Sequence, residues 1–406
     1  MIYLKLAWRN LFRNKRRTVL SALAIGVGIA ALIFVDALLI GWKENMVRTA
    51  TATFMGQGQV HHTGYRDTLE VGKTIEHPQK KVNKLKSNPD IQWVTLRTQT
   101  FGMIASPGNV QSILINGIDP KTEKEMSKLD DAIIEGHFLK KNNENNKMLI
   151  GKKLADILGV ELGDKVVLTV AQAKTGQTSQ EMFRIGGIFE FKIRQMDRSM
   201  AFIDLQRSQK LLGIKDNIHE IAFTFKNQEL STHPEHPVWT LLDDPNLEVL
   251  SWLALMPELK AMLKWLNVSM LIMSVILFGI VAAGIVNTLF MSLYERMFEF
   301  GVLRAVGTRP GNLAWLIVLE AGALAVISAV SGSVMGGVLV LIFSKVGLDY
   351  SDTEFVNVAI IDRIYPVMEP YQFMVYPLAL IVFTMVIGLY PAIHAARMTP
   401  AKAMKK

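Results

Sequence analysis

The sequence predicts an α-helical membrane protein with four transmembrane helices and a large α+β extracytoplasmic domain inserted between helices 1 and 2. Three observations lead to this fold class. Half of the 406 residues are hydrophobic, and the mean hydropathy is +0.26. The apolar residues gather in four stretches that each reach the roughly 20 residues needed to cross a bilayer as a helix. Between the first and second stretches, residues 42–265 have the composition of a soluble domain.

Composition excludes several classes of protein. The chain contains no cysteine, which excludes a disulfide scaffold, a thiol nucleophile and zinc–thiolate or iron–sulfur sites. Lys and Arg number 44 against 36 Asp and Glu, a net charge of +8. Because the basic residues lie beside the apolar stretches, we interpret this charge as a topology signal and a contact with anionic lipid. We expect no nucleic-acid partner.

The four apolar stretches are residues 18–41, 266–293, 313–346 and 373–393. Each is too long for a core strand and carries too few charges for an amphipathic helix of a soluble protein. The first stretch is also longer than the apolar part of a typical signal peptide. We therefore expect it to be retained as the first span.

Charge predicts the orientation of the spans. Residues 1–17 carry six basic side chains and no acid, and residues 394–406 carry four basic side chains and no acid. The link 347–372 instead carries five acids and one Arg. The positive-inside rule then places both termini and the link 294–312 in the cytoplasm. Residues 42–265 and 347–372 are expected outside, in the periplasm.

Two cytoplasmic segments show helical amphipathicity. Residues 1–17 place apolar side chains at helical spacing, which predicts an interface helix that turns into the first span near Thr18. The link 294–312 has an apolar stripe with paired charges and ends at Gly307 and Pro310. It is expected either to lie on lipid or to dock on a partner, and its charges of both signs favour a partner. Its candidate docking residues are Glu295, Arg296, Met297, Phe298, Glu299, Val302, Leu303 and Arg304.

Three motifs make the chain similar to a known family. The runs Asn287–Gly307, Trp8–Thr18 and Gly388–Ala403 resemble the signature of FtsX/MacB/Lol-type ABC transporter permeases, and the start at Met1 favours the Lol-type arrangement. The resemblance implies that the link 294–312 is a coupling helix that docks on a separate ATPase. The chain lacks a G-x-x-x-x-G-K-[ST] phosphate loop. We therefore expect no catalytic residue, cofactor or metal here, and ATP and Mg on the partner ATPase.

Alternating apolar residues predict short strands in the external domain, and three short helices are expected among them. A polar connection, residues 171–181, joins the strand ending near Val170 to one starting near Met182. One interpretation is a solvated loop. The resemblance implies instead a protruding hook that binds a periplasmic lipoprotein carrier, although the Pro expected at its tip is missing. The candidate carrier-binding residues are Lys174, Thr175, Gly176, Gln177 and Thr178.

Other polar residues invite functional hypotheses. The scattered histidines, among them His61 and His219, form no H-E-x-x-H pattern, and we expect exposed loop histidines rather than metal ligands. Within the spans, Asp36, Asn287 and Glu320 are candidates for function. Snorkelling or helix pairing is an equal alternative for Glu320. Small residues at four-residue intervals predict close helix contacts at Gly279, Ala283, Ser328, Gly332 and Gly336.

Together, the resemblance implies a non-enzymatic permease subunit of an inner-membrane ABC complex in a Gram-negative bacterium. Such a complex extracts lipoproteins and passes them to a periplasmic carrier, driven through mechanical transmission by two ATPase copies. Its other partners are a second permease, identical or paralogous, the lipoprotein substrates and the lipid bilayer. The alternatives are MacB-like export of peptides or macrolides, FtsX-like regulation of a cell-wall hydrolase, and an enzyme, for which no catalytic set is visible.

Overall fold

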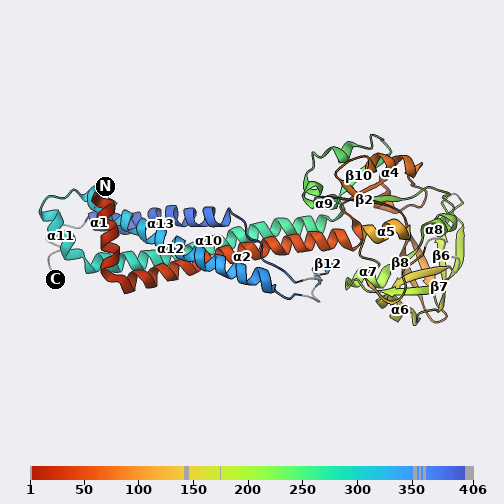
Figure 1. The fold of residues 1–406 in the computed structure, drawn as a ribbon, viewed down its shortest axis with the longest axis horizontal. Coiled ribbons are helices and arrows are strands. Elements are labelled where there is room, and N and C mark those ends of the chain that lie inside the picture. The colour runs from red at the N-terminus through yellow and green to blue at the C-terminus, as the bar shows by residue number, and fades with distance from the viewer. Residues whose placement is uncertain are drawn as a thin grey trace. The chain divides into compact units, whose positions relative to one another are not determined.

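The computed structural model describes residues 2–140, 146–173, 175–350, 354–355, 358–359 and 363–397 (Figure 1). The chain divides into two compact units. A helical unit comprises residues 1–44, 263–349 and 363–406, and an α+β unit comprises residues 45–262 and 350–362. The α+β unit falls between the first and second long helices in sequence.

Four helices in the described residues are long and apolar enough to cross a membrane. Each continues beyond its apolar stretch, because polar turns at its ends also adopt helical geometry. Short helices precede the first long helix and separate the second from the third. The helices are α1 (Ile2–Leu11), η1 (Phe12–Asn14), α2 (Lys15–Ala50), α10 (Pro257–Glu295), α11 (Met297–Ala305), α12 (Pro310–Val346) and α13 (Gln372–Ala396).

Small residues let the long helices approach closely. A Cβ on Gly332 of α12 would lie 2.6 Å from the Gly26 backbone oxygen of α2. A Cβ on Gly336 would lie 3.1 Å from the Cβ of Ile33. The predicted close contact is therefore confirmed for these two glycines. It is wrong within this chain for Gly279, whose missing Cβ has no neighbour within 4 Å among the described residues.

The α+β unit contains a ten-stranded sheet. Its strands are β1 (Gly58–His62), β2 (Ile91–Ala105), β3 (Val110–Ile118), β4 (Ile133–Gly136), β5 (Lys147–Gly151), β6 (Lys165–Ala171), β7 (Thr178–Phe189), β8 (Met200–Asp204), β9 (Glu220–Phe225) and β10 (Leu247–Ser251). Helical segments in this unit are η2 (Thr51–Met55), α3 (Tyr65–Thr68), α4 (Pro78–Lys86), α5 (Pro120–Met126), α6 (Lys152–Leu158), α7 (Arg194–Ser199), α8 (Leu205–Leu212), η3 (Gln228–Thr232), η4 (Pro237–Thr240) and α9 (Trp252–Leu255). A separate pair, β11 (Glu354–Phe355) and β12 (Val358–Ala359), is antiparallel.

Strand pairing closes part of the sheet into a ring. The order β2–β3–β8–β5–β7–β6 returns to β2, because β6 pairs with both β7 and β2. On its other side β2 continues through β9 and β1 to β10. Alternate side chains of the ring strands point into one buried core, which explains the period-two patterns in the sequence.

Most strands that the alternation predicts are confirmed. Alternation predicts strands at residues 92–105 and 110–117, and β2 and β3 agree with these ranges to within one residue at each end. β7 starts at Thr178 rather than Met182, because its first residues pair with β6 although they are polar. The strands β1, β4, β5 and β10 carry no clear alternation and were not predicted.

Candidate functional site

The link between α10 and α12 folds as a short helix fixed at both ends. Helix α10 ends at Glu295 because Arg296 leaves helical geometry, with φ −107° and ψ 12°. Helix α11 stops before Gly307, whose φ of +102° suits a residue without Cβ, and Pro310 then opens α12. Phe300 of α11 is buried in a core with Leu313 and Ile317 of α12. One face of α11 is thus anchored to the helical unit.

The opposite side of α11 presents apolar side chains to the outside. Phe298 is 63% exposed and Val306 is 83% exposed. Val302 and Leu303 of the same segment are exposed as well. Large side chains exposed this far, on a helix already anchored by Phe300, form an apolar surface suited to a partner. We call Phe298, Val302, Leu303 and Val306 the α11 surface.

The N-terminal segment holds α11 through ion pairs. Arg13 donates to Glu299 over 2.6 Å, and Arg17 pairs with Glu295. The predicted pairing of charges inside the link holds for Arg296 and Glu299, 3.2 Å apart. The sequence did not assign Arg13 and Arg17 to this site. Asn10, Arg13 and Arg17 are spaced three and four residues apart, which places them on one face of a helix. This spacing could have predicted that they share a site.

Glu320 of α12 completes this arrangement. It accepts a hydrogen bond from Arg296 Nη1 and another from Asn10 Nδ2, each over 2.7 Å. The carboxylate is 7% exposed. Of the two alternatives for this residue, the contacts support helix pairing. We call α1, η1, α11 and the adjoining ends of α10 and α12 the elbow.

Two charged residues of α11, Glu299 and Arg304, differ in their hydrogen bonding. Burial opposes the charged form of Glu299, but hydrogen bonds from Arg13 and Arg296 outweigh it and hold the pKa of Glu299 below its usual value. The guanidinium of Arg296 also lies 4.9 Å from the ring centre of Phe300. In contrast, Arg304 Nε is buried and has no hydrogen-bond partner among the described residues.

The two other polar candidates in the long helices differ. Asp36 is buried and accepts hydrogen bonds from Tyr371 and, over 3.0 Å, from Gln372 Nε2. It therefore ties α2 to the start of α13. Asn287 of α10 is exposed. The structure brings Glu320 to the elbow and leaves Asp36 and Asn287 away from it.

The candidate carrier-binding loop is a short hairpin. Ala171 of β6 pairs with Thr178 of β7, so the connection is residues 172–177 rather than 171–181. Gln172 N donates to Gln177 O over 2.9 Å, and Gly176 adopts φ +65°. Thr175, Gly176, Gln177 and Thr178 are all exposed. Lys174 lies outside the described residues.

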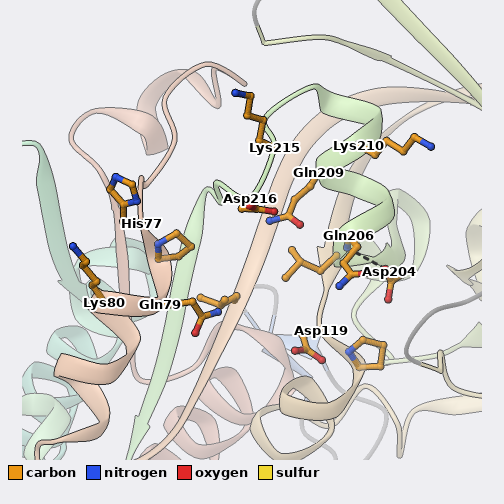
Figure 2. A pocket seen from close by; sticks show the side chains of 14 residues that line it. His77, Gln79, Lys80, Asp119, Asp204, Gln206, Gln209, Lys210, Lys215 and Asp216 are labelled. Atoms are coloured by element: carbon orange, nitrogen blue, oxygen red, sulfur yellow. Dashed lines mark hydrogen bonds between the residues drawn. The ribbon is translucent and has the colours of Figure 1, made fainter.

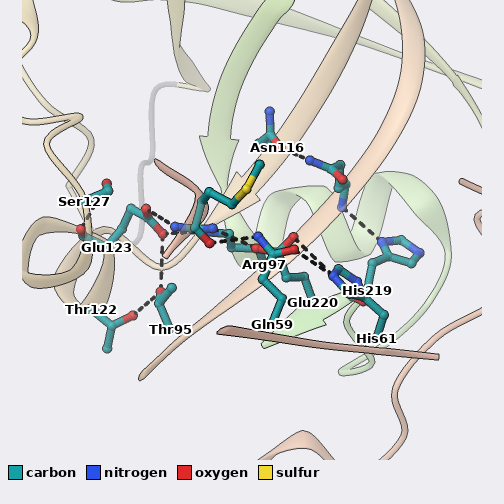
Figure 3. Close-up of polar contacts among 12 residues, drawn as sticks. Gln59, His61, Thr95, Arg97, Asn116, Thr122, Glu123, Ser127, His219 and Glu220 are labelled. Atoms are coloured by element: carbon teal, nitrogen blue, oxygen red, sulfur yellow. Dashed lines mark hydrogen bonds and ion pairs between the residues drawn. The ribbon is translucent and has the colours of Figure 1, made fainter. Parts of the chain in front are cut away.

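The expectation of exposed loop histidines is wrong for His61 and His219. Both are fully buried, His61 in β1 and His219 directly before β9 (Figure 3), and each ring stacks on the ring of Tyr65. Gln99 N donates to His219 Nδ1 over 3.1 Å, and His219 Nε2 lies 3.0 Å from Val71 O. Burial lowers the pKa of each histidine to about 4. The sequence does not show whether a histidine has buried hydrogen-bond partners, so a buried histidine cannot be told from one in an exposed loop. This explains the wrong prediction.

Next to these histidines is a fully buried ion cluster that sequence reasoning missed. Arg97 of β2 donates to Glu123 of α5 from Nε and Nη2, over 2.9 and 2.7 Å (Figure 3). Its Nη1 donates to Glu220 of β9 over 2.7 Å. These residues are far apart in sequence, so no short sequence motif predicts that they form ion pairs.

The α+β unit also contains a polar cleft of about 860 Å³ (Figure 2). Its wall includes Lys80 of α4, Lys210 of α8 and Lys215. Asp119 and Asp204 also line it. Both carboxylates cap helices, Asp119 accepting from Lys121 N and Asp204 from Gln206 N. Because helix capping already explains both carboxylates, they do not indicate a particular ligand for the cleft.

The comparison with known proteins assigns the family. Residues 271–400, which contain the elbow link, match the FtsX-like permease C-terminal family. Residues 18–232 match the MacB-like periplasmic core domain, which is more than half of the chain. The chain belongs to the FtsX-like and MacB-like family of ABC transporter permeases. The resemblance seen in the sequence motifs is thereby confirmed.

Full-length relatives of this permease include lipoprotein-releasing system transmembrane proteins. LolC of Xylella fastidiosa (strain 9a5c) is 22% identical over 97% of this chain and 96% of its own length. LolE of Haemophilus influenzae is 20% identical over 95% of this chain and 93% of its own length. The macrolide export protein MacB of Campylobacter jejuni (strain 81-176) is 21% identical over 99% of this chain, which spans 61% of that protein.

Solved structures with some likeness cover 48% of the permease. The extracellular domain of YknZ from Gram-positive bacteria is 14% identical, with a TM-score of 0.34 and 98% of that chain covered. The periplasmic region of MacB from Actinobacillus actinomycetemcomitans is 15% identical, with a TM-score of 0.35 and 88% of that chain covered.

Proposed function

We propose that this permease extracts lipoproteins from the inner membrane of a Gram-negative bacterium and passes them to a periplasmic carrier. The observation that carries the proposal is the end-to-end match to lipoprotein-releasing proteins of nearly equal length, 97% of this chain against 96% of LolC from Xylella fastidiosa. In the same comparison the chain spans only 61% of MacB from Campylobacter jejuni.

Energy for extraction comes from a separate ATPase, present in two copies, which binds ATP and Mg and docks on the α11 surface. The exposed side chains of Phe298 and Val306 support this assignment. They belong to a segment that the buried side chain of Phe300 anchors to α12. This chain itself is a non-catalytic subunit.

The four long helices cross the membrane, with the α+β unit inserted after the first. Both termini and the elbow lie in the cytoplasm, and the α+β unit lies in the periplasm. The excess of Arg and Lys near the elbow supports this orientation. A second permease, identical or paralogous, completes the complex. The exposed residues 175–178 of the hairpin are the docking site for the lipoprotein carrier.

Release of a labelled lipoprotein tests the proposal. The permease is purified with its ATPase, reconstituted with a fluorescent triacylated lipoprotein, and given ATP and a soluble carrier. We expect ATP-dependent transfer of label to the carrier, and none without ATP. ATP turnover without transfer, for any carrier and lipoprotein encoded by the same organism, contradicts the proposal.

The relative from Campylobacter jejuni favours a second candidate, because its match covers 99% of this chain. In that case the cargo is a macrolide or peptide, and an adaptor and outer-membrane channel copurify with the permease. ATP-dependent efflux of macrolide from whole cells, lost on deletion of this permease and accompanied by no lipoprotein release, supports the second candidate over the first.

A further inference from the structure

Within the α+β unit, the chain following α2 is held by an unusual turn. Residues Thr51–Met55 form a π-helical segment that continues α2, with Thr51, Thr53 and Phe54 buried. Gly56 N donates to Thr51 O over 2.8 Å, which closes the wider turn. A π-helical turn costs conformational free energy, and it persists only where contacts with the surrounding structure stabilise it.

Backbone contacts attach this turn to the sheet. Lys128 N donates to Ala52 O over 3.0 Å, and Gln57 N donates to Phe223 O of β9 over 3.0 Å. Gln59 Nε2 of β1 donates to Met55 O over 2.8 Å. A Cβ on Gly58 would lie 2.3 Å from the ring of Phe223, so no larger residue fits there without displacing that ring. The end of the helix therefore lies directly against β1 and β9.

Side-chain contacts centre on Arg97. Its guanidinium lies 3.8 Å from the ring centre of Phe54. The same group binds Glu123 and Glu220 through three hydrogen bonds, and all three ionic residues are at most 1% exposed. Arg97 thus joins four elements, namely η2, β2, β9 and α5.

The chemistry of this contact makes it resist displacement. A planar guanidinium meets two carboxylates only in one orientation, whereas apolar side chains slide past one another at lower cost. Removing either carboxylate from its buried partner leaves an uncompensated charge, with a large penalty. Movement of η2 is therefore expected to carry β2, β9 and α5 with it.

We propose that Arg97 is the positioning residue that passes movement of α2 into the α+β unit, with Phe54 as its contact on the helix. This inference rests on the proposed function, because it concerns how ATP-driven movement reaches the domain that handles cargo. Arg97 acts through Phe54, Glu123 and Glu220 and touches no substrate itself.

The test compares Arg97→Lys and Phe54→Leu with the matched control Phe189→Leu, in the complete complex with ATPase. Arg97→Lys keeps the charge but loses the planar fork, and Phe54→Leu keeps an apolar side chain but loses the ring. Phe189 is fully buried in the same core and packs on Phe202 without being one of the Arg97 contacts. Thermal unfolding confirms that each variant folds. A fourth variant, combining Arg97→Met with Glu123→Gln and Glu220→Gln, removes the cluster without leaving a buried charge.

Two readouts separate this role from a structural one. The first is lipoprotein released per ATP hydrolysed, expected to fall at least tenfold in Arg97→Lys, Phe54→Leu and the combined variant but not in Phe189→Leu. The second needs no cargo and follows amide hydrogen exchange in β1 and β9 with and without ATP. We expect an ATP-dependent change in the wild type and in Phe189→Leu that is lost in the other three variants.

Equal hydrogen-exchange responses in all variants overturn the role of Arg97, whatever the cargo. An exchange response that depends on Arg97, without lipoprotein release by the wild type, instead supports Arg97 and contradicts the proposed function.

Discussion

Glu320 shows how one carboxylate organises the elbow. It lies near the start of α12 and binds Arg296 from the link and Asn10 from α1. The sequence left a functional role, snorkelling and helix pairing open for this residue. It could not name the partners, because Asn10 is 310 positions away. Only the folded helices bring these residues together.

Replacing Glu320 by Ala is expected to destabilise the helical unit by about 2–3 kcal/mol, because Arg296 loses a largely buried partner and Asn10 its acceptor. The measurement is thermal unfolding of the purified permease in detergent. The control is Asn287→Ala, which changes an exposed polar residue and should stay within about 0.5 kcal/mol of the wild type. Equal effects of the two changes contradict the assignment of Glu320.

His219 predicts a dependence of stability on acid. In the folded chain burial lowers its pKa to about 4, whereas an unfolded histidine titrates near ~6.5. Between these values the unfolded state binds a proton that the folded state excludes. The stability contributed by the neutral histidine is therefore complete above pH ~6.5 and declines as the pH falls towards 4.

We expect the melting temperature of the α+β unit, followed in the full chain, to fall between pH 7 and pH 4.5, and to fall less steeply in His219→Gln. The control is His233→Gln, which alters an exposed histidine and should retain the wild-type slope. A slope unchanged by His219→Gln indicates that other groups cause the acid sensitivity.

At the scale of elements, spacing predicted the long helices, α11 and most strands, but it missed short helices of the α+β unit such as α5 and α7. Apolar runs and caps such as Pro310 are local signals, and they located α11 and α12 well. The hairpin and the contacts of Gly279 were predicted less well. The first residues of β7 are polar yet paired, and a glycine in a helix does not reveal whether its open side meets another helix of the same chain.

The packing of α2 on α12 depends on Gly332. Its Cβ position lies 2.6 Å from the backbone oxygen of Gly26, so Gly332→Ala must push the helices apart and should cost about 1–3 kcal/mol. Gly279→Ala is the control, because no described atom lies within 4 Å of its Cβ position. Detergent melting curves should show a loss for the first change and none for the second.

The α11 surface is expected to lose ATPase binding on Phe298→Asp. This residue lies in the first turn of α11, where an acid favours the helix, so the change removes an apolar contact without unwinding the element. Affinity for the ATPase, measured by pull-down from detergent, should fall at least tenfold. The control Phe101→Asp alters a phenylalanine of similar exposure, 59%, on β2. Retention of the ATPase by Phe298→Asp contradicts docking at α11.

At the scale of the whole molecule, composition and charge predicted more than any single site. Placing charges in a bilayer costs free energy. The sequence therefore shows long apolar stretches, with basic residues at their cytoplasmic ends. No sequence pattern predicts the buried cluster of Arg97, because its members come from three separate segments. Fold class and family were therefore predictable, whereas the contacts within the elbow and within the α+β unit were not.

The account depends on α11 and the α+β unit lying on opposite sides of the membrane, and cysteine labelling tests this most directly. The natural chain has no cysteine, so Phe298→Cys and Phe101→Cys each introduce a single reactive thiol. With a membrane-impermeant maleimide, we predict that Phe101→Cys is labelled from the periplasmic side and Phe298→Cys only in inverted vesicles, with protection by the bound ATPase. Labelling of both thiols from the same side would contradict the account.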